Sequence, residues 1–484
     1  MIDMRLLPLL TVLLLAFGLM ACDTVIDDTI DPIDSAADAD LNNPDEVNFL
    51  VNGIRARGNN VHENITVQSS LMSDQFIFGG AHGGGATFPT FRDIMRGLPA
   101  DTNPLNNNSV DGTQNHLGQY RFLADNLLRR VENLGAEAFG GEDDERYQQA
   151  LFTGNFHGAL ARYYWATYFS DLPGTDAIGG GVISDLENPA DPERSEFLQA
   201  DQLYDDAITR LDAAAAFASD YEVRVINSVK ARIALFRNNA SQAATFAADG
   251  LEPGDAPFQN EFVDRSGNQQ NTWHTQGGIG RAQTVPAPRF FYAADYLNRD
   301  FAAAESGRIP LLDPGALGIA ADFGTVTEAG LANREAVHPL RVALSGVGIG
   351  DEILLPLQGR YDNRGSDIDF ISWQEMHLIR AEDAERSGDS GTAQSLINEV
   401  RDSYGIAPLA SYDGMNTIFV ERDKEMFTTG IRLVDQRRAT RFGLDAEGLD
   451  LDVHGWHLSN DVWWYLPITL AERLNNPNLP NELP

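Results

Sequence analysis

The chain has 484 residues, 43% of them hydrophobic, which is enough for a large folded core. Its 71 acidic side chains outnumber its 35 basic ones and give a net charge of −36. Such a field repels nucleic-acid phosphates, and no compact basic patch overrides it, so we expect no nucleic-acid partner. The single cysteine excludes a disulfide within the chain.

Residues 1–21 predict an export signal. Arg5 precedes an apolar run over 6–18, which is shorter than the roughly 20 residues of a membrane span but fits a secretory signal peptide. The segment ends in Leu19-Met20-Ala21-Cys22, which resembles a bacterial lipobox. We therefore predict that residues 1–21 are removed and that a lipid on Cys22 is the only attachment to the membrane.

Residues 22–41 predict an acidic tether. The segment is rich in Asp, Ala, Ser and Thr, a composition that stays solvated because it offers little apolar surface to bury. We expect the rest of the chain, 42–484, to fold as a single domain.

Apolar residues three and four apart predict helices through much of the N-terminal half. Helices are expected over 43–57 and 61–74, with Gly58-Asn59-Asn60 as the break between them. A glycine-rich, hairpin-like stretch is expected to end at Pro192. Further helices are predicted over 116–128, 146–169, 200–218, 221–237 and 240–249. Because the last three are short, alanine-rich and closely spaced, they are able to stack as pairs.

The stretch 371–438 predicts two antiparallel helices on a tight turn, followed by a charged run. That run is dense in Glu and Arg and invites an acid–base interpretation. Glu421 and Glu425 are one helical turn apart, where each is able to pair with Arg422 or Arg432. We therefore predict structural ion pairs that hold the last helices together, rather than a catalytic site.

Two segments, 75–115 and 251–360, lack helical periodicity and predict long loops. Glycines crowd 79–85, and prolines interrupt the second segment repeatedly. One helix is expected there, over 287–301. The fold class that follows is mostly α, with helix pairs forming a scaffold, long loop-rich insertions and little β structure.

Six pieces in order resemble the SusD/RagB-like family of outer-membrane nutrient-binding lipoproteins. They are the lipobox, L-G-Q-Y-R-F-L-A-D-N at 117–126, G-N-F-H-G-A-L-A-R-Y-Y-W-A-T-Y-F-S-D-L-P at 154–173, D-Q-L-Y-D-D-A-I-T-R-L-D-A-A at 201–214, the pair at 373–404 with E-R-D-K-E-M-F-T-T-G-I-R-L-V-D-Q-R-R at 421–438, and the closing L-P-I with N-N-P-N-L. The resemblance covers nearly the whole mature chain.

The resemblance implies a body of tetratricopeptide-like helix pairs that carries a loop-rich ligand face, mainly 75–115 and 251–360. It also implies a surface-exposed lipoprotein of the outer membrane, facing the cell exterior. Such a protein captures an oligosaccharide or other oligomeric nutrient and delivers it to a SusC-like TonB-dependent transporter. The capture region departs from the family's tryptophan-rich glycan binders, which leaves the ligand class open.

Aromatic side chains in these loops are suited to stack on sugar rings or other flat apolar faces, because they offer large areas at low entropic cost. Arginine and histidine side chains nearby are suited to supply polar contacts. We predict a ligand-binding set of Phe76, His82, Phe88, Arg92, Trp273, His274, Arg289 and Tyr292.

The sequence offers no H-E-x-x-H motif, no paired cysteines and no phosphate-binding glycine loop, so we predict no metal, no cofactor and no catalytic residue. An extracytoplasmic hydrolase would need a convergent acid–base or nucleophile motif, which is missing. The alternative that remains is a helical-repeat scaffold lipoprotein that organises envelope protein complexes without a small ligand.

Overall fold

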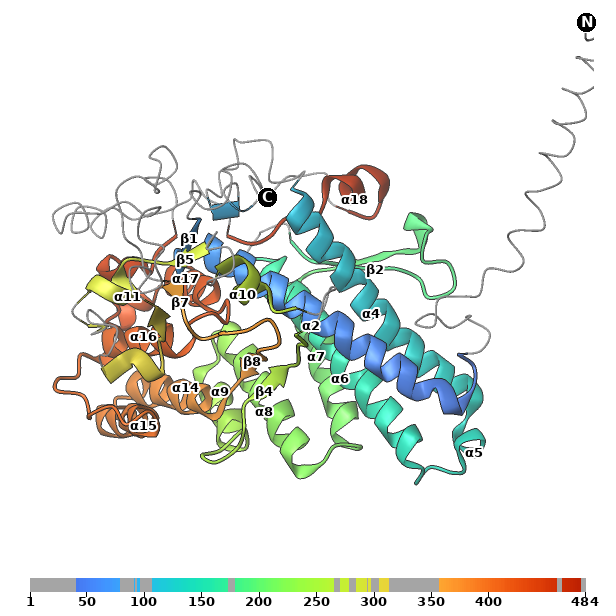
Figure 1. Ribbon diagram of the computed structural model, residues 1–484, viewed down its shortest axis with the longest axis horizontal. Helices are drawn as coiled ribbons and strands as arrows, with labels where there is room; N and C mark the ends of the chain where they lie inside the picture. Colours follow the sequence, from blue (N-terminus) through green and yellow to red (C-terminus); the bar gives the residue numbers. More distant parts are fainter. Residues whose placement is uncertain are drawn as a thin grey trace, which may run out of the picture.

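The computed structural model describes residues 41–78, 91, 94–95, 107–172, 179–264, 270–277, 284–293, 295–296, 304–312, 357–458 and 464–479. Within these residues the chain is mostly helical (Figure 1). The predicted signal peptide, Cys22 and all but the last residue of the tether lie outside them.

The long helices of the N-terminal half are α2 (Val47–Met72), α4 (Asn108–Leu134), α6 (Glu145–Tyr168), α7 (Ala200–Ala215), α8 (Asp220–Phe236) and α9 (Ala240–Ala248). Those of the C-terminal half are α14 (Trp373–Arg386), α15 (Ser390–Ser403), α16 (Gly414–Glu425) and α17 (Arg432–Arg441). Shorter helices are α5 (Ala136–Phe139), α10 (Thr272–Gly277), α11 (Arg289–Tyr292) and α18 (Leu470–Asn475). Short 3-10 turns are η1 (Pro44–Glu46), η3 (Pro192–Arg194), η4 (Ala304–Gly307), η6 (Leu444–Glu447) and η7 (Val453–Gly455).

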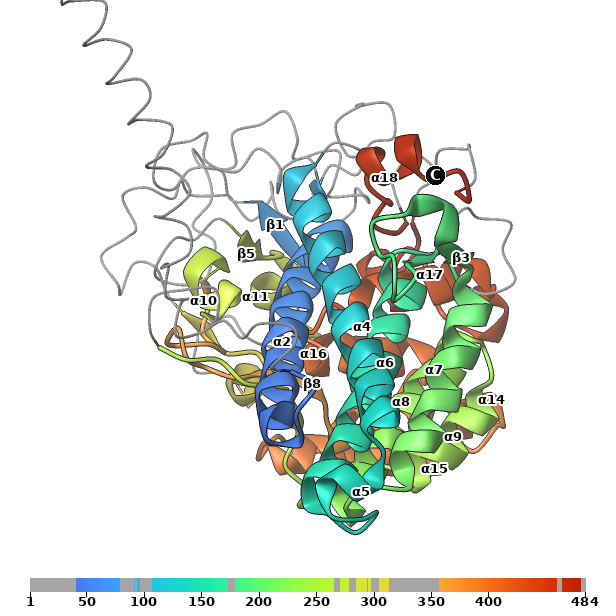
Figure 2. The ribbon, with the colours of Figure 1, turned by 90° about the vertical axis from the view of Figure 1, so that its right-hand side faces the viewer.

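The long helices pack in chain order. Helix α2 contacts α4, α4 contacts α6, α6 contacts α7, and the series continues through α8, α9 and α14 to α15. Figure 2 shows α2, α4, α6 and α7 standing side by side. Because most helices neighbour the next one, the body is a stack of tetratricopeptide-like pairs, and the predicted mostly α fold class is confirmed.

Helix α6 lies at the centre of this stack. Asp144 caps its first turn by accepting a hydrogen bond from the Arg146 backbone amide at 2.9 Å. Its aromatic side chains point to several sides, and Phe156, Tyr163 and Tyr164 are all buried. A helix that is apolar nearly all round has to be covered on all sides, which is why α2, α4 and α7 surround it.

The predicted break at Gly58-Asn59-Asn60 is wrong, because α2 runs without interruption from Val47 to Met72. Gly58 has helical backbone geometry, and a Cβ atom there would lie 2.9 Å from the ring of Tyr120 on α4. The glycine therefore permits close approach of two helices, and its cost in helix propensity, about 1 kcal/mol, is offset by packing.

The described strands form four antiparallel two-stranded pairs. They are β1 (Phe76–Phe78) with β5 (Thr284–Pro286), β2 (Gly181–Ile183) with β3 (Glu196–Leu198), β4 (Phe258–Asn260) with β8 (Ile368–Ile371), and β6 (Leu311–Leu312) with β7 (Leu357–Gln358). The β2–β3 pair is a hairpin in the expected region, but its second strand begins at Glu196, beyond the predicted end at Pro192. In the β1–β5 pair, Phe76 lies opposite Pro286, so the two predicted loop segments are joined by a short sheet.

Two predicted boundaries are also corrected. Helix α4 begins at Asn108, within the expected loop 75–115, because Asn107 caps it by accepting from the amides of Ser109 and Val110. The helix expected to begin at 287 and continue to 301 begins at Arg289 and ends after the four residues of α11, since Ala293 is already extended with ψ of 139°.

The charged run forms structural ion pairs, as predicted, but Glu421, Arg422 and Arg432 pair with other residues than the predicted ones. Arg422 pairs with Asp435 at 3.1 Å, and both side chains are buried. Glu421 pairs with Lys424 at 3.0 Å, with Arg401 at 2.9 Å and with Arg308 at 2.7 Å. The burial of Glu421 raises its pKa, but these three cations outweigh that effect and lower it to about 2.

A buried ion pair joins the two halves of the helical stack. Arg232 on α8 and Glu375 on α14 are 2% and 0% exposed, and the guanidinium Nε donates to the Glu375 Oε1 at 2.9 Å. The same guanidinium donates to the Phe370 carbonyl of β8 at 2.7 Å. Fully paired charges of this kind stabilise one arrangement of α8, β8 and α14.

Replacing Arg232 by Met is expected to lower the free energy of unfolding by about 3–5 kcal/mol, because Glu375 is left buried without a counter-ion. Urea denaturation followed by circular dichroism measures the change. The control Arg237→Met removes a more exposed arginine that pairs with Asp205, and is expected to cost less than about 1 kcal/mol. Equal losses in the two variants would contradict this role for Arg232.

Candidate functional site

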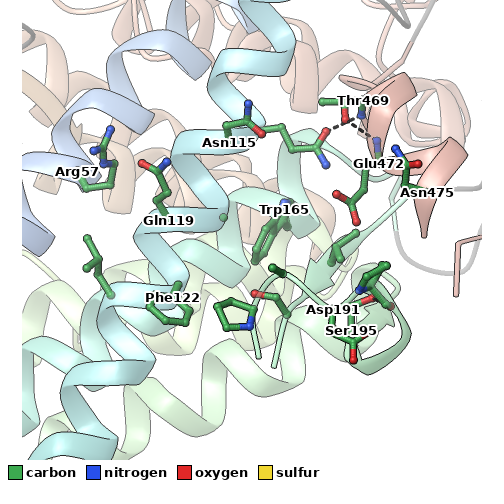
Figure 3. A pocket seen from close by; sticks show the side chains of 18 residues that line it. Arg57, Asn115, Gln119, Phe122, Trp165, Asp191, Ser195, Thr469, Glu472 and Asn475 are labelled. Atoms are coloured by element: carbon green, nitrogen blue, oxygen red, sulfur yellow. Dashed lines mark hydrogen bonds between the residues drawn. The ribbon is translucent and has the colours of Figure 1, made fainter. Parts of the chain in front are cut away.

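A cleft of about 870 Å³ opens between α4, the β2–β3 hairpin and α18 (Figure 3). Its volume is in the range of pockets that hold small ligands. The lining residues are Arg57, Gln114, Asn115, Gly118, Gln119, Phe122, Leu123, Trp165, Val182, Ser184, Pro189, Ala190, Asp191, Pro192, Ser195, Thr469, Glu472 and Asn475.

One face of α4 forms a wall of the cleft. Asn115, Gly118, Gln119 and Phe122 are three or four residues apart and therefore share that face. The opposite face carries buried residues, among them Tyr120, which pack on α2 and α6. The amphipathic pattern of α4 thus orients two amide side chains and one phenylalanine toward the cleft.

Trp165 of α6 lines the cleft between its two ends (Figure 3). The indole is only 2% exposed, so it serves as a floor rather than as a stacking platform. A Cβ atom on Gly181 of β2 would lie 2.7 Å from the indole ring, so glycine is needed for the hairpin to pack this closely. Phe122, half-buried on α4, supplies the more accessible aromatic surface.

Side-chain hydrogen bonds connect the walls near α18. Gln114 on α4 accepts from the Thr469 amide at 2.6 Å, and Thr469 in turn caps α18 by accepting from the Glu472 amide at 3.1 Å. Asn476 donates to Ser195 beside β3 at 2.7 Å and to the Glu472 carboxylate at 2.7 Å. The C-terminal segment is therefore held against α4 and the hairpin, which keeps the cleft's walls in place.

The chemistry of the cleft is that of a site for a small polar ligand. Amides from α4 both donate and accept hydrogen bonds, hydroxyl and carboxylate groups from the hairpin and α18 add acceptors, and Phe122 and Val182 add apolar area. Within the described residues, no three His, Cys, Asp or Glu side chains converge as metal ligands would. The arrangement can bind a ligand rich in hydroxyl groups by hydrogen bonding and apolar contact.

The structure corrects the predicted roles of Phe76 and Trp273. Both side chains are 0% exposed, and their ring centroids lie 4.5 Å apart. The Trp273 indole Nε1 donates to the Thr66 hydroxyl at 3.0 Å, which satisfies its one polar group inside the core. These aromatics anchor β1 and α10 to the body and present no surface to a ligand.

Arg289 is likewise corrected from a ligand contact to a buried structural cation. Its side chain is 5% exposed and pairs with Asp423 at 2.9 Å and with Asp74 at 3.3 Å. Burial opposes its charge, but these two carboxylates outweigh burial and raise its pKa. Because its guanidinium is buried and paired with both carboxylates, Arg289 is not available to a ligand.

The other predicted contacts remain predictions. His274 is partly exposed on α10, with Nδ1 3.3 Å from the Tyr361 carbonyl oxygen. Tyr292 ends α11, and its side chain lies outside the described residues, as do His82, Phe88 and Arg92.

Sequence reasoning missed the cleft because it assigned 116–128 to the scaffold. A signal was present, since Gly118 and Gln119 interrupt an otherwise well-patterned helix on one face. Nothing in the sequence indicated that residues 191–195 and 469–475 fold against that face. Their meeting there depends on the whole intervening stack.

A stack of helix pairs with a ligand-sized cleft defines a helical-repeat architecture with room for a small ligand. No family model and no curated protein matches this sequence. Solved structures do match it. A SusD-like carbohydrate binding protein from Bacteroides vulgatus has a TM-score of 0.61 at 13% identity, covering 90% of this chain and 97% of that one.

Two other solved structures are similar. A laminarin binding SusD-like protein has a TM-score of 0.57 at 14% identity, covering 88% of this chain and 97% of that one. Surface glycan-binding protein A from Bacteroides uniformis has a TM-score of 0.55 at 16% identity, covering 86% and 93%. The fold is therefore the SusD-like fold, and the resemblance seen in the sequence is confirmed at that level.

Helix α10 is attached to α2 through a buried carboxyl group. The Thr272 amide donates to Glu63 Oε2 at 2.8 Å, and the Asn60 side chain lies 3.1 Å from Oε1. Glu63 is 3% exposed, and burial raises its pKa to about 8 although the hydrogen bonds lower it. Glu63 is therefore mostly protonated at neutral pH, and its ionisation opposes the docking of α10.

Because the folded-state pKa of Glu63 is raised, its contribution to stability is full below the ordinary value near 4.5 and is lost as pH rises through about 8. Glu63→Gln is expected to remove this loss, since a glutamine still accepts from Thr272 and is able to donate toward Asn60 Oδ1, which is buried without a partner among the described residues. The wild-type chain should thus lose stability relative to the variant between pH 5 and 9, as measured by urea denaturation. The exposed Glu132→Gln serves as control, and parallel pH curves for wild type and Glu63→Gln would refute the prediction.

Proposed function

We propose that this chain is a surface-exposed lipoprotein of the outer membrane, anchored through Cys22, that binds an oligosaccharide or other oligomeric nutrient. It hands that ligand to a SusC-like TonB-dependent transporter. The observation that carries the proposal is the SusD-like fold, shared over 90% of the chain with a carbohydrate binding protein. A fold alone does not define a function, so the site and the N-terminus have to support it too.

The cleft supports ligand binding. It combines side-chain amides, hydroxyls and carboxylates with the partly accessible ring of Phe122 and the floor of Trp165. Sugars present hydroxyl groups at their edges and apolar C–H faces, and this mixture of groups matches both. The solved structures of similar fold are described as binding proteins, and we propose that this chain also binds its ligand without chemical turnover.

The N-terminus supports the membrane location. The lipobox-like segment that ends at Cys22 and the acidic tether precede the folded body. The first described element of that body, η1, begins at Pro44. No helix among the described residues is long and apolar enough to span a bilayer. In the proposal a lipid on Cys22 holds the body at the membrane.

Gly118→Trp tests the cleft as the ligand site. Gly118 lines the cleft, and a Cβ atom there meets nothing within 4 Å, so an indole is able to enter the cleft without displacing the helix. The wild-type protein is expected to be retarded in gels that contain the preferred polysaccharide, and the variant to bind at least about tenfold more weakly. Affinity electrophoresis across a polysaccharide panel, followed by calorimetry, measures this.

The matched control is Gly112→Trp, which places the same side chain at another open position of α4 outside the cleft. It is expected to bind like wild type. Wild-type affinity in both variants would remove the cleft from the proposal. Binding of no saccharide or peptide in the panel, or products detected by mass spectrometry, would overturn the binding function itself.

Cys22→Ala tests the anchor and the transporter partner together. Wild-type protein is expected to incorporate labelled palmitate, to fractionate with the outer membrane and to co-purify with a TonB-dependent β-barrel after mild detergent extraction. The variant should lose the label and the membrane association, because no other cysteine can carry the lipid. Ser35→Ala in the tether is the control, and lipid labelling that survives in Cys22→Ala would contradict the proposal.

A further inference from the structure

Arg57 of α2 lines the cleft as a partly buried cation. Among the described residues its guanidinium has no carboxylate partner, and burial lowers its pKa without a nearby acid to compensate. Neighbouring arginines are different: Arg121 and Arg162, on α4 and α6, both pair with Asp125, at 3.4 and 2.9 Å. The chain has 71 acidic and 35 basic side chains, so acidic residues are not scarce, yet none of the described ones pairs with Arg57.

Each of the two carboxylates that line the cleft accepts a hydrogen bond from its own wall of the cleft. Asp191 accepts from the Glu193 amide at 3.1 Å and caps η3. Glu472 accepts from the Asn476 side chain at 2.7 Å and lies in the first turn of α18. Figure 3 shows both at the end of the cleft away from Arg57, with Trp165 between the two ends.

Two amide side chains of α4 also line the cleft, and Figure 3 shows Gln119 on the Arg57 side of Trp165. Asn115 and Gln119 are exposed on α4, and neither side chain has a hydrogen-bond partner in the described part of the chain. His116 follows Asn115, and its pKa is lowered by burial and by the charge of Arg57, so it is neutral at pH 7. The Arg57 end therefore carries one positive charge with hydrogen-bond donors beside it.

A planar guanidinium flanked by amides suits a planar or tetrahedral anion, because its N–H groups are able to donate in pairs to two oxygens. The net charge of −36 repels free anions at long range, but salt screens that field beyond about 8 Å at physiological ionic strength. An anionic group carried on a ligand that fills the rest of the cleft would still reach Arg57. The binding of the whole ligand then offsets the repulsion.

We propose that the cleft selects acidic saccharides, with Arg57 holding an anionic substituent, a carboxylate or a sulfate, and with Asn115 and Gln119 bonding the adjacent hydroxyls. This inference rests on the proposed binding function and names its substrate class. Neutral sugars lack the group that Arg57 requires and bind more weakly.

The experiment compares matched ligand pairs on the full-length lipoprotein in detergent, by calorimetry at 0.15 M salt. One pair is trigalacturonic acid and its methyl ester, which keeps the shape but loses the charge. The second pair is a sulfated galactan oligomer and its desulfated form, which distinguishes sulfate from carboxylate. At least about tenfold tighter binding of the charged member of one pair is expected.

Arg57→Gln is expected to reduce that preference to less than about twofold by weakening only the charged ligand. Arg55→Gln removes the same charge from an exposed position of the same helix, outside the cleft, and is expected to keep the preference. Thermal melts check that Arg57→Gln and Arg55→Gln are folded. We expect both to fold, because neither arginine has an ion-pair partner among the described residues. A second variant, Gly118→Trp, is expected to weaken the binding of both the charged and the neutral ligand of each pair.

The remaining outcomes overturn the inference. Equal affinity for charged and neutral members, or equal effects of the Arg57 and Arg55 variants, would show that Arg57 selects nothing. Tight binding of neutral glycans with no binding of the acidic ones would overturn the inference and leave the proposed function standing. Binding of no saccharide at all would overturn the inference and the saccharide part of the proposed function.

Discussion

Distant parts of the chain converge on Asp74. It follows α2 with a positive φ of 70°. Its carboxylate pairs with Arg289, the first residue of α11, and with Arg432, the first residue of α17. Asp423 on α16 pairs with the same two arginines, at 2.9 and 3.1 Å. All four side chains are at most 5% exposed, so two anions and two cations neutralise one another out of water.

A buried cluster of this kind constrains the whole molecule. Each charge has lost its hydration, which costs several kcal/mol per ion, and only close counter-ions offset that cost. Loss of any one element would leave the others with unpaired buried charges, so α2, α11, α16 and α17 are held together. Burial raises the pKa of Asp423, but Arg289 and Arg432 outweigh that effect and lower it, which keeps the cluster charged at neutral pH.

The fold separates this rigid charge cluster from the cleft. Within the cluster every arginine named here is paired, whereas in the cleft Arg57 has no acidic partner among the described residues. The cleft is also built from elements remote in sequence, namely α4, the β2–β3 hairpin and α18, which are connected by Gln114 and Asn476. A scaffold stabilised elsewhere allows these few polar groups to remain available to a ligand.

The sequence by itself determined the helical stack, because periodicities of three and four residues are local and specify which face of each helix is buried. It also indicated the structural role of the Glu and Arg run near Glu421, since residues one turn apart pair within a helix. It did not determine that Gly58 continues a helix, that Trp273 and Arg289 are core residues, or that Thr469 meets Gln114. Those facts depend on contacts between residues that are far apart in the chain, and only the tertiary structure decided them, because burial is a property of the assembled neighbours and not of the residue type.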